Sequence, residues 1–174
     1  QKTVLYDESA RVPLIIACQG KTAGSISDKL VNTGIDLVPT MLEHAGLEAP
    51  KDLPGLSLLP LAFGQPVRAW RDHVVVENHM NQAGELDGLR PEMEGRMVRT
   101  ERYKYCVFSL GRHRESLVDM EADPGEVVNL AFDPKHRGEL LRHRALLERF
   151  GREHNDLLVA RLLADNVKPL PFIE

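Results

Sequence analysis

The stretch Lys2-Thr3-Val4-Leu5-Tyr6-Asp7-Glu8-Ser9-Ala10-Arg11-Val12-Pro13-Leu14-Ile15-Ile16 places a lysine and a cluster of charged residues directly before an apolar run. The run continues to Ala17 and is rich in branched aliphatic side chains. Such runs are typical of a strand that is buried on both faces, as in a parallel sheet flanked by helices. Val12 to Ala17 therefore predicts a strand of an α/β domain. Its place so near the first residue predicts that the chain is the back part of a larger protein.

A helix is expected to follow, after a polar loop. Asp36 is a suitable N-cap, because its carboxylate can accept the free N–H groups of a first turn. Pro39 would then fall in that turn, where its missing N–H costs nothing, and Gly46 would end the helix. The apolar face of this helix is predicted to consist of Leu37, Val38, Met41, Leu42 and Ala45.

Residues 47–69 carry four prolines and two glycines, which break regular structure. Several leucines lie among them, so the segment is interpreted as a loop held against a core rather than as a free linker. It also marks the expected boundary between two structural units, residues 1–66 and 67–174.

The second unit is predicted to be a small antiparallel sheet packed on a C-terminal helix. Residues 135–163 show helical spacing of leucines, with Gly151 as a break or kink, and His136, His143 and His154 on the solvated face. The strands are expected at His73–Glu77, Arg96–Thr100, Tyr103–Phe108 and Ser116–Met120. The fold class is therefore α/β for the parent protein and α+β for this chain, with the last strand and helix of an α/β domain preceding the sheet.

Composition excludes several classes of function. The net charge is −4 and the isoelectric point is near 6.0, so no basic excess would attract nucleic acid or an anionic membrane. No apolar run approaches the roughly 20 residues that a membrane helix needs. The two cysteines lie far apart and outside any C-x-x-C pattern, which predicts buried free thiols. No signal peptide is present. Because the chain does not begin with Met, that absence indicates no compartment, whether periplasmic, secreted or cytoplasmic.

Five segments resemble, in order, motifs of the type I sulfatases, the formylglycine-dependent members of the alkaline-phosphatase-like superfamily. In the first, Asp-Glu-Ser follows the tyrosine where many members have Glu-Gly-Gly, so the subgroup stays open. The segments are Lys2…Tyr6-Asp7-Glu8-Ser9…Arg11-Val12-Pro13, Ile35-Asp36-Leu37-Val38-Pro39-Thr40-Met41-Leu42, Pro54-Gly55-Leu56-Ser57-Leu58-Leu59-Pro60-Leu61, Val98-Arg99-Thr100…Tyr103-Lys104-Tyr105 and Leu117-Val118-Asp119-Met120-Glu121-Ala122-Asp123-Pro124-Gly125-Glu126…Asn129-Leu130.

The resemblance implies a catalytic role for Lys2 in the parent protein. In the family, the matching lysine contacts the sulfate group of the substrate. A compact ammonium suits this role, because negative charge gathers on the bridging oxygen as the S–O bond breaks. Tyr6, Asp7, Glu8 and Arg11 are expected to be structural, with Arg11 paired to Asp7 or Glu8.

Other parts of the family's machinery are not recognisable in the chain. The nucleophile of the family is a Cys or Ser in C/S-x-P-x-R that becomes formylglycine, and the sequences after Cys18 and Cys106 do not match it. The calcium ligands, which include an early Asp-Asp pair, are also missing. Formylglycine and calcium are therefore expected upstream of Gln1, neither is expected on this chain, and the isolated chain is expected to be inactive.

Glu77-Asn78-His79 is the one suggestive polar group in the second unit. It is predicted to end a strand and to open a polar loop over residues 81–94, where Glu77 and His79 would select the alcohol part of a sulfate ester. An exposed loop without a ligand is the simpler interpretation. Two other functions stay open for the chain. One is a phosphonate or phosphate monoester hydrolase of the same superfamily, and the other is a non-catalytic binding module.

Overall fold

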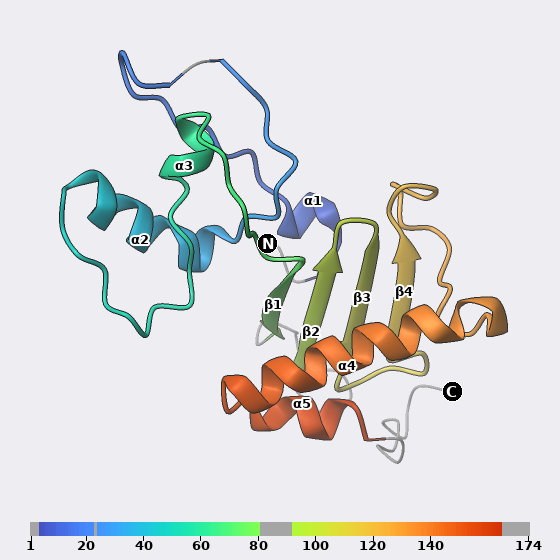
Figure 1. The fold of residues 1–174 in the computed structure, drawn as a ribbon. Helices are drawn as coiled ribbons and strands as arrows, with labels where there is room; N and C mark the ends of the chain where they lie inside the picture. The colour runs from blue at the N-terminus through green and yellow to red at the C-terminus, as the bar shows by residue number, and fades with distance from the viewer. Residues whose placement is uncertain (1–3, 23, 81–91, 165–174) are drawn as a thin grey trace. The chain divides into compact units, whose positions relative to one another are not determined.

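The computed structural model describes residues 4–22, 24–80 and 92–164 (Figure 1). They form two compact units. One combines the described residues before Pro13 with those from Val75 onward, and the other is Pro13–Val74. The boundary expected at residue 66 concerns the domains of the parent protein and stays a prediction.

The first unit is built on a four-stranded antiparallel sheet, as the sequence predicted. Its strands lie in the order of the chain, and β2–β3 and β3–β4 pair antiparallel. The first strand extends beyond Glu77 and the second begins before Arg96, so both are longer than expected. The strands are β1 (His73–Met80), β2 (Met93–Thr100), β3 (Tyr103–Phe108) and β4 (Glu115–Asp119).

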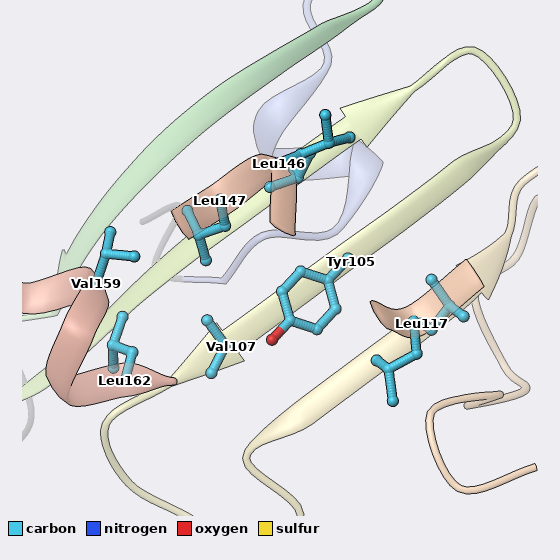
Figure 2. Packing of buried hydrophobic residues seen from close by; sticks show 9 residues of the cluster. Tyr105, Val107, Leu117, Leu146, Leu147, Val159 and Leu162 are labelled. Carbon is cyan, nitrogen blue, oxygen red and sulfur yellow. The ribbon is translucent and has the colours of Figure 1, made fainter. Parts of the chain in front are cut away.

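One face of the sheet packs against two helices, α4 (Arg137–Glu153) and α5 (Leu157–Leu162) (Figure 1). Tyr105 and Val107 alternate along β3 and point to this face, where both side chains are fully buried. Figure 2 shows them facing the helical leucines and the valine of α5. The labelled core consists of Tyr105, Val107, Leu117, Leu146, Leu147, Val159 and Leu162.

The opposite face of the sheet is covered by the N-terminal segment, which includes the short helix α1 (Asp7–Ala10). Leu5 is only 5% exposed and packs with Met97 and Cys106. The sheet is therefore covered on both faces, and both β2 and β3 contain runs of four buried residues. Cys106 is a free thiol, and its burial raises its pKa to about 12.

The C-terminal helix breaks after Glu153 and not at Gly151, which corrects the sequence-based expectation. Asn155 has a φ of 55° and separates α4 from α5, and the Asp156 carboxylate accepts the Leu158 N–H to cap the second helix. Gly151 lies inside α4, and the Val159 side chain packs against it. A Cβ at residue 151 would lie 2.8 Å from the Val159 Cβ.

His143 was expected on the solvated face of this helix, and that expectation is wrong. Its side chain is fully buried, and Nε2 lies 3.2 Å from the Thr100 hydroxyl at the end of β2. Nδ1 lies 3.0 Å from the Glu139 carbonyl one turn earlier in α4. Both ring nitrogens thus have polar neighbours, which makes burial of the ring tolerable.

Residues 12–17, which run from the end of the first unit's N-terminal segment into the second unit, form no strand, in contrast to the prediction. Ile15 is 87% exposed, and Val12 and Leu14 are also exposed. A strand buried on both faces requires neighbouring strands to bond its backbone and helices to cover its side chains. The described residues supply neither for this segment, so the apolar run stays extended and open to solvent.

The second unit contains the predicted helix, α2 (Thr33–His44), and the short α3 (Leu59–Ala62). Asn32, and not Asp36, is the N-cap of α2, since its side chain accepts the Gly34 N–H. Pro39 therefore lies in the helix interior, where the Ile35 carbonyl has no N–H partner four residues on.

Asp36 instead holds the unit together. Its carboxylate is fully buried and accepts N–H groups from Asn32 and Leu56, both within 2.9 Å. Arg71 donates to both of its oxygens at 2.5 and 2.6 Å. Thr40, one turn later, accepts the Leu58 N–H at 2.9 Å. The motif on α2 and the motif on the following loop are thus joined, because side chains of the helix accept backbone N–H groups of the loop.

The apolar face expected for α2 is exposed rather than buried. Leu37, Val38 and Met41 lie 38%, 46% and 61% exposed. The residues of α2 that are buried are Asp36, Pro39 and Thr40, which face the loop at residues 55–58. Among the described helices, none is both long and apolar enough to span a membrane.

We expect Gly55→Ala to destabilise the second unit. A Cβ at this position would lie 1.9 Å from the Ile35 carbonyl oxygen, the acceptor that Pro39 leaves without a helical partner. Overpacking of this kind costs about 1–3 kcal/mol or more of unfolding free energy. Gly24→Ala is the matched control, because nothing lies within 4 Å of its added Cβ. Urea unfolding measures both variants, and equal stability would contradict the close approach.

Acid should weaken the second unit through Asp36. Burial by itself would raise its pKa, but the hydrogen bonds from Arg71, Leu56 and Asn32 hold the pKa below its usual 3.8. A depressed folded-state pKa gives stability that is present above 3.8 and is lost as pH falls through the lower folded value. Urea unfolding from about pH 6 down to about pH 2 should therefore show a steeper loss for the wild type than for Asp36→Asn. Parallel pH profiles would exclude this role.

Candidate functional site

The candidate catalytic residue, Lys2, lies outside the described residues. The described part of the same motif begins at Val4 and runs through α1, and an ion triad attaches it to the sheet. Lys104 on β3 is only 1% exposed, and its Nζ donates to Asp7 Oδ1 at 2.9 Å and to Glu126 Oε1. The Asp7 N–H donates to the same Glu126 oxygen at 2.7 Å. We call Asp7, Lys104 and Glu126 the Lys104 triad.

Water has little access to the triad. Its electrostatic interactions are therefore strong, and each charge needs its partner. The Glu126 side chain is 5% exposed and that of Asp7 is 22% exposed. A buried ammonium is tolerated only where carboxylates and hydrogen bonds replace its water. Two carboxylates face one ammonium here, so the Lys104 charge is compensated and the triad as a whole carries one net negative charge.

The turn after β4 brings Glu126 to this position. Asp123-Pro124-Gly125-Glu126 has a composition typical of turns, and the Glu126 N–H donates to the Asp123 carbonyl at 3.1 Å. Glu126 itself adopts a φ of 55°, which is unfavourable for a residue other than glycine. We attribute the choice of glutamate at this strained position to its carboxylate, which reaches Lys104.

Asn129, also in the last motif, covers the outer edge of β4. Its side-chain oxygen accepts the Leu117 N–H at 3.1 Å, and its nitrogen donates to the Glu115 carbonyl at 2.9 Å. The Leu130 N–H donates to the Leu117 carbonyl at 2.7 Å. These bonds occupy backbone groups that an edge strand would otherwise offer to another chain.

A pocket of about 260 Å³ lies beside α1 in the first unit. Its lining consists of Asp7, Glu8, Arg11, Arg99, Met120 and Pro124. The sequence suggested that Arg11 pairs with Asp7 or Glu8. Among the described residues, no ion pair joins Arg11 to either carboxylate. Asp7 is bound by Lys104 instead. Arg11 therefore enters this pocket with its charge uncompensated by a direct partner in the described part of the chain.

Glu77 and His79, the candidate substrate-binding residues, both lie within β1, because the strand continues past its predicted end at Glu77. Glu77 is 60% exposed at its side chain and lies 3.4 Å from Arg96, which also binds Asp156 at the start of α5 at 2.6 Å. His79 lies 4.0 Å from Glu92, and both side chains are exposed. Glu77 thus points to the helical face, whereas Asp7 contacts the opposite face. The loop between them and β2 falls largely outside the described residues.

The sequence did not lead us to predict that Lys104 and Glu126 interact, although both lie in segments that resemble the sulfatase motifs. The signal available was a lysine between two tyrosines in an otherwise apolar strand. The described residues contain no group of three or more His, Cys, Asp or Glu that could hold a metal ion.

Comparisons with known proteins agree with this architecture. Residues 1–150 match the family model of N-sulphoglucosamine sulphohydrolase, C-terminal. The chain is 39% identical over 145 residues to a Δ4,5-hexuronate-2-O-sulfatase of Bacteroides thetaiotaomicron, covering 82% of this chain and 29% of the relative. The chain therefore belongs to this sulfatase family, within the alkaline-phosphatase-like superfamily.

Solved structures show the same fold. A crystal structure of a putative sulfatase from Bacteroides thetaiotaomicron superposes with a TM-score of 0.79 at 34% identity, over 98% of this chain and 35% of that one. A phosphonate monoester hydrolase from Silicibacter pomeroyi superposes with a TM-score of 0.72 at 28% identity, over 87% of this chain and 31% of that one. The chain thus spans about a third of the length of these relatives.

Lys104→Met should destabilise the first unit strongly. The substitution keeps most of the side-chain volume but leaves Asp7 and Glu126 as buried carboxylates without their cation. Removing one partner of a buried ion pair costs about 3–5 kcal/mol of unfolding free energy.

The matched control is Lys29→Met, since Lys29 pairs with Asp28 at the surface, with side chains 46% and 82% exposed. Exposed pairs contribute about 0–1 kcal/mol. Guanidinium unfolding followed by circular dichroism compares the two variants. A Lys104 variant as stable as the Lys29 variant would show that the triad is not an ordered, buried cluster.

Proposed function

We propose that this chain is the C-terminal part of a sulfatase that hydrolyses sulfate esters, and that Lys2 contacts the sulfate of the substrate. Membership of the family supports the reaction class. The observation that carries the proposal for Lys2 is the Lys104 triad. It fastens the lysine-bearing segment to the sheet through Asp7, only a few residues after Lys2.

The chemistry proposed for Lys2 is electrostatic. As the ester S–O bond breaks, negative charge grows on the bridging oxygen, and a nearby ammonium stabilises that charge more than it stabilises the substrate. A lysine acts here as a compact point charge, unlike the planar fork of an arginine. The segment must be held rigidly for this effect, because stabilisation depends on donors that are already in place.

Formylglycine and calcium are proposed to belong to the upstream part of the same protein. Formylglycine, a modified residue, would supply the nucleophile, and calcium would supply the Lewis acid of the reaction. The described residues provide no ligand set for calcium. The 174 residues alone are accordingly proposed to be inactive.

The upstream part of the protein is also the proposed partner of the second unit. The exposed face of α2 with Leu37, Val38 and Met41 supports this, as does Ile15 in the extended apolar run. Apolar groups clustered in this way are typical of surfaces that another part of a protein covers. Glu77 and His79 are proposed to contact the alcohol part of the substrate from β1.

A phosphonate or phosphate monoester hydrolase is the second candidate function. The structural similarity to the phosphonate monoester hydrolase of Silicibacter pomeroyi favours it, since that protein shares this fold over 87% of the chain. Both candidates place an anionic tetrahedral group beside Lys2. They differ in the central atom of that group and in its charge.

Turnover of an aryl sulfate and of aryl phosphate and phosphonate esters by the full-length parent protein tests the proposal. We expect the sulfate to be hydrolysed with the highest kcat/KM. Lys2→Ala should lower kcat/KM by about 10²–10³-fold, as is usual when one donor to a developing charge is lost. Lys135→Ala, at an exposed position before α4, should leave it unchanged. Preferential hydrolysis of the phosphonate would establish the second candidate instead.

A further inference from the structure

We propose that Arg11 and Arg99 bind an oxyanion, a sulfate or a carboxylate, in the pocket beside α1. The pocket has a volume of about 260 Å³ and lies wholly within the first unit. Arg11 reaches it from the end of α1 and Arg99 from β2. Two guanidinium groups that line one pocket offer the donor geometry that sulfate and carboxylate oxygens prefer.

Arg99 is held in place by the tight turn between β2 and β3. Its Nη1 donates to the Thr100 carbonyl and, at 2.9 Å, to the Glu101 carbonyl. Glu101-Arg102 is a poor pair for a primed turn, and neither residue adopts a positive φ. The guanidinium of Arg99 thus takes part in holding this turn. Its Nε and Nη2 groups donate to no other residue among those described.

A hydrogen bond fixes the backbone of Arg11, whereas its guanidinium has no ion-pair partner among the described residues. Its N–H donates to the Asp7 carbonyl at 2.8 Å, which closes the turn of α1. The residue is exposed, and no carboxylate lies within ion-pair distance of its guanidinium in the described part of the chain. Arg11 can therefore turn toward an anion in the pocket without giving up an existing ion pair.

Two carboxylates, Asp7 and Glu8, line the pocket together with the two arginines. Of its two carboxylates, Asp7 is already bound by Lys104, so Glu8 is the one that opposes an anion directly. Burial lowers the pKa of Arg99 from its usual value, and the charge of Arg11 lowers it further, against the opposite influence of Asp7 and Glu126. Arg11 and Arg99 therefore repel one another across the pocket. An oxyanion between the two guanidinium groups would offset that repulsion.

Titration of the 174-residue chain with sodium sulfate, followed by NMR at constant ionic strength with sodium chloride, tests this site. We expect saturable shifts of the Arg99 Nε–H and of the backbone amides of Arg11 and Glu101, with a dissociation constant on the order of 1 mM. A parallel titration with acetate tests the carboxylate. Shifts with both anions establish a general oxyanion site, and shifts with one identify the preferred group.

Arg11→Gln should weaken binding by about 10-fold, as expected for the loss of one charge-assisted contact. It keeps the fold, because the Arg11 side chain makes no bond to the rest of the described chain. Arg112→Gln is the matched control, as Arg112 is another exposed arginine outside the pocket. Shifts no larger than with chloride, or equal affinities for the two variants, would overturn the proposal. No turnover is measured, so this result is independent of the sulfatase activity.

Discussion

A lysine buried between two carboxylates determines where the N-terminal segment lies on the sheet. Lys104 comes from β3, Glu126 from the turn after β4 and Asp7 from α1, so three distant parts of the chain meet at one ammonium. Leu5, next to this cluster, closes the apolar core on the same face with Met97 and Cys106. Without Asp7, neither the core contact nor the approach of α1 would have a fixed register, because apolar contacts alone do not specify direction.

In the second unit, too, a buried charged side chain joins separate segments, and here it is a carboxylate. Asp36 is a buried carboxylate whose partners are Arg71 and two backbone N–H groups, and Thr40 adds a bond to the Leu58 N–H. Polar contacts thus hold α2 to the following loop, while the apolar side of the helix is left open. A small unit held in this way gains little from hydrophobic burial, which fits a piece whose main core is shared with another part of a larger protein.

Much of the sheet could be predicted from sequence because strand alternation and turn residues are local signals. The burial of Lys104 could not, because its partner Asp7 lies 97 residues away and lysine is normally exposed. The cap of α2 was misassigned because Asn32 and Asp36 are both good caps, and the distant Arg71, which binds Asp36, decides between them. Val12 to Ala17 has the composition of an inner strand, but composition does not supply the neighbouring strands. The choice of Lys2, Glu77 and His79 as candidate site residues rests on resemblance and position, whereas the attachment of the segment at Asp7 follows from the structure.

Hydrogen exchange at the Asp7 amide tests this tether most directly. The Asp7 N–H donates to Glu126 Oε1 at 2.7 Å, at the start of a single helical turn that would give it no protection by itself. We expect this amide to exchange much more slowly than an unstructured amide in the wild-type chain, and to lose that protection in Glu126→Ala while the β3 amides stay protected. Exchange of the wild-type Asp7 amide at the rate of an unstructured peptide would contradict the placement of the lysine-bearing segment on the sheet.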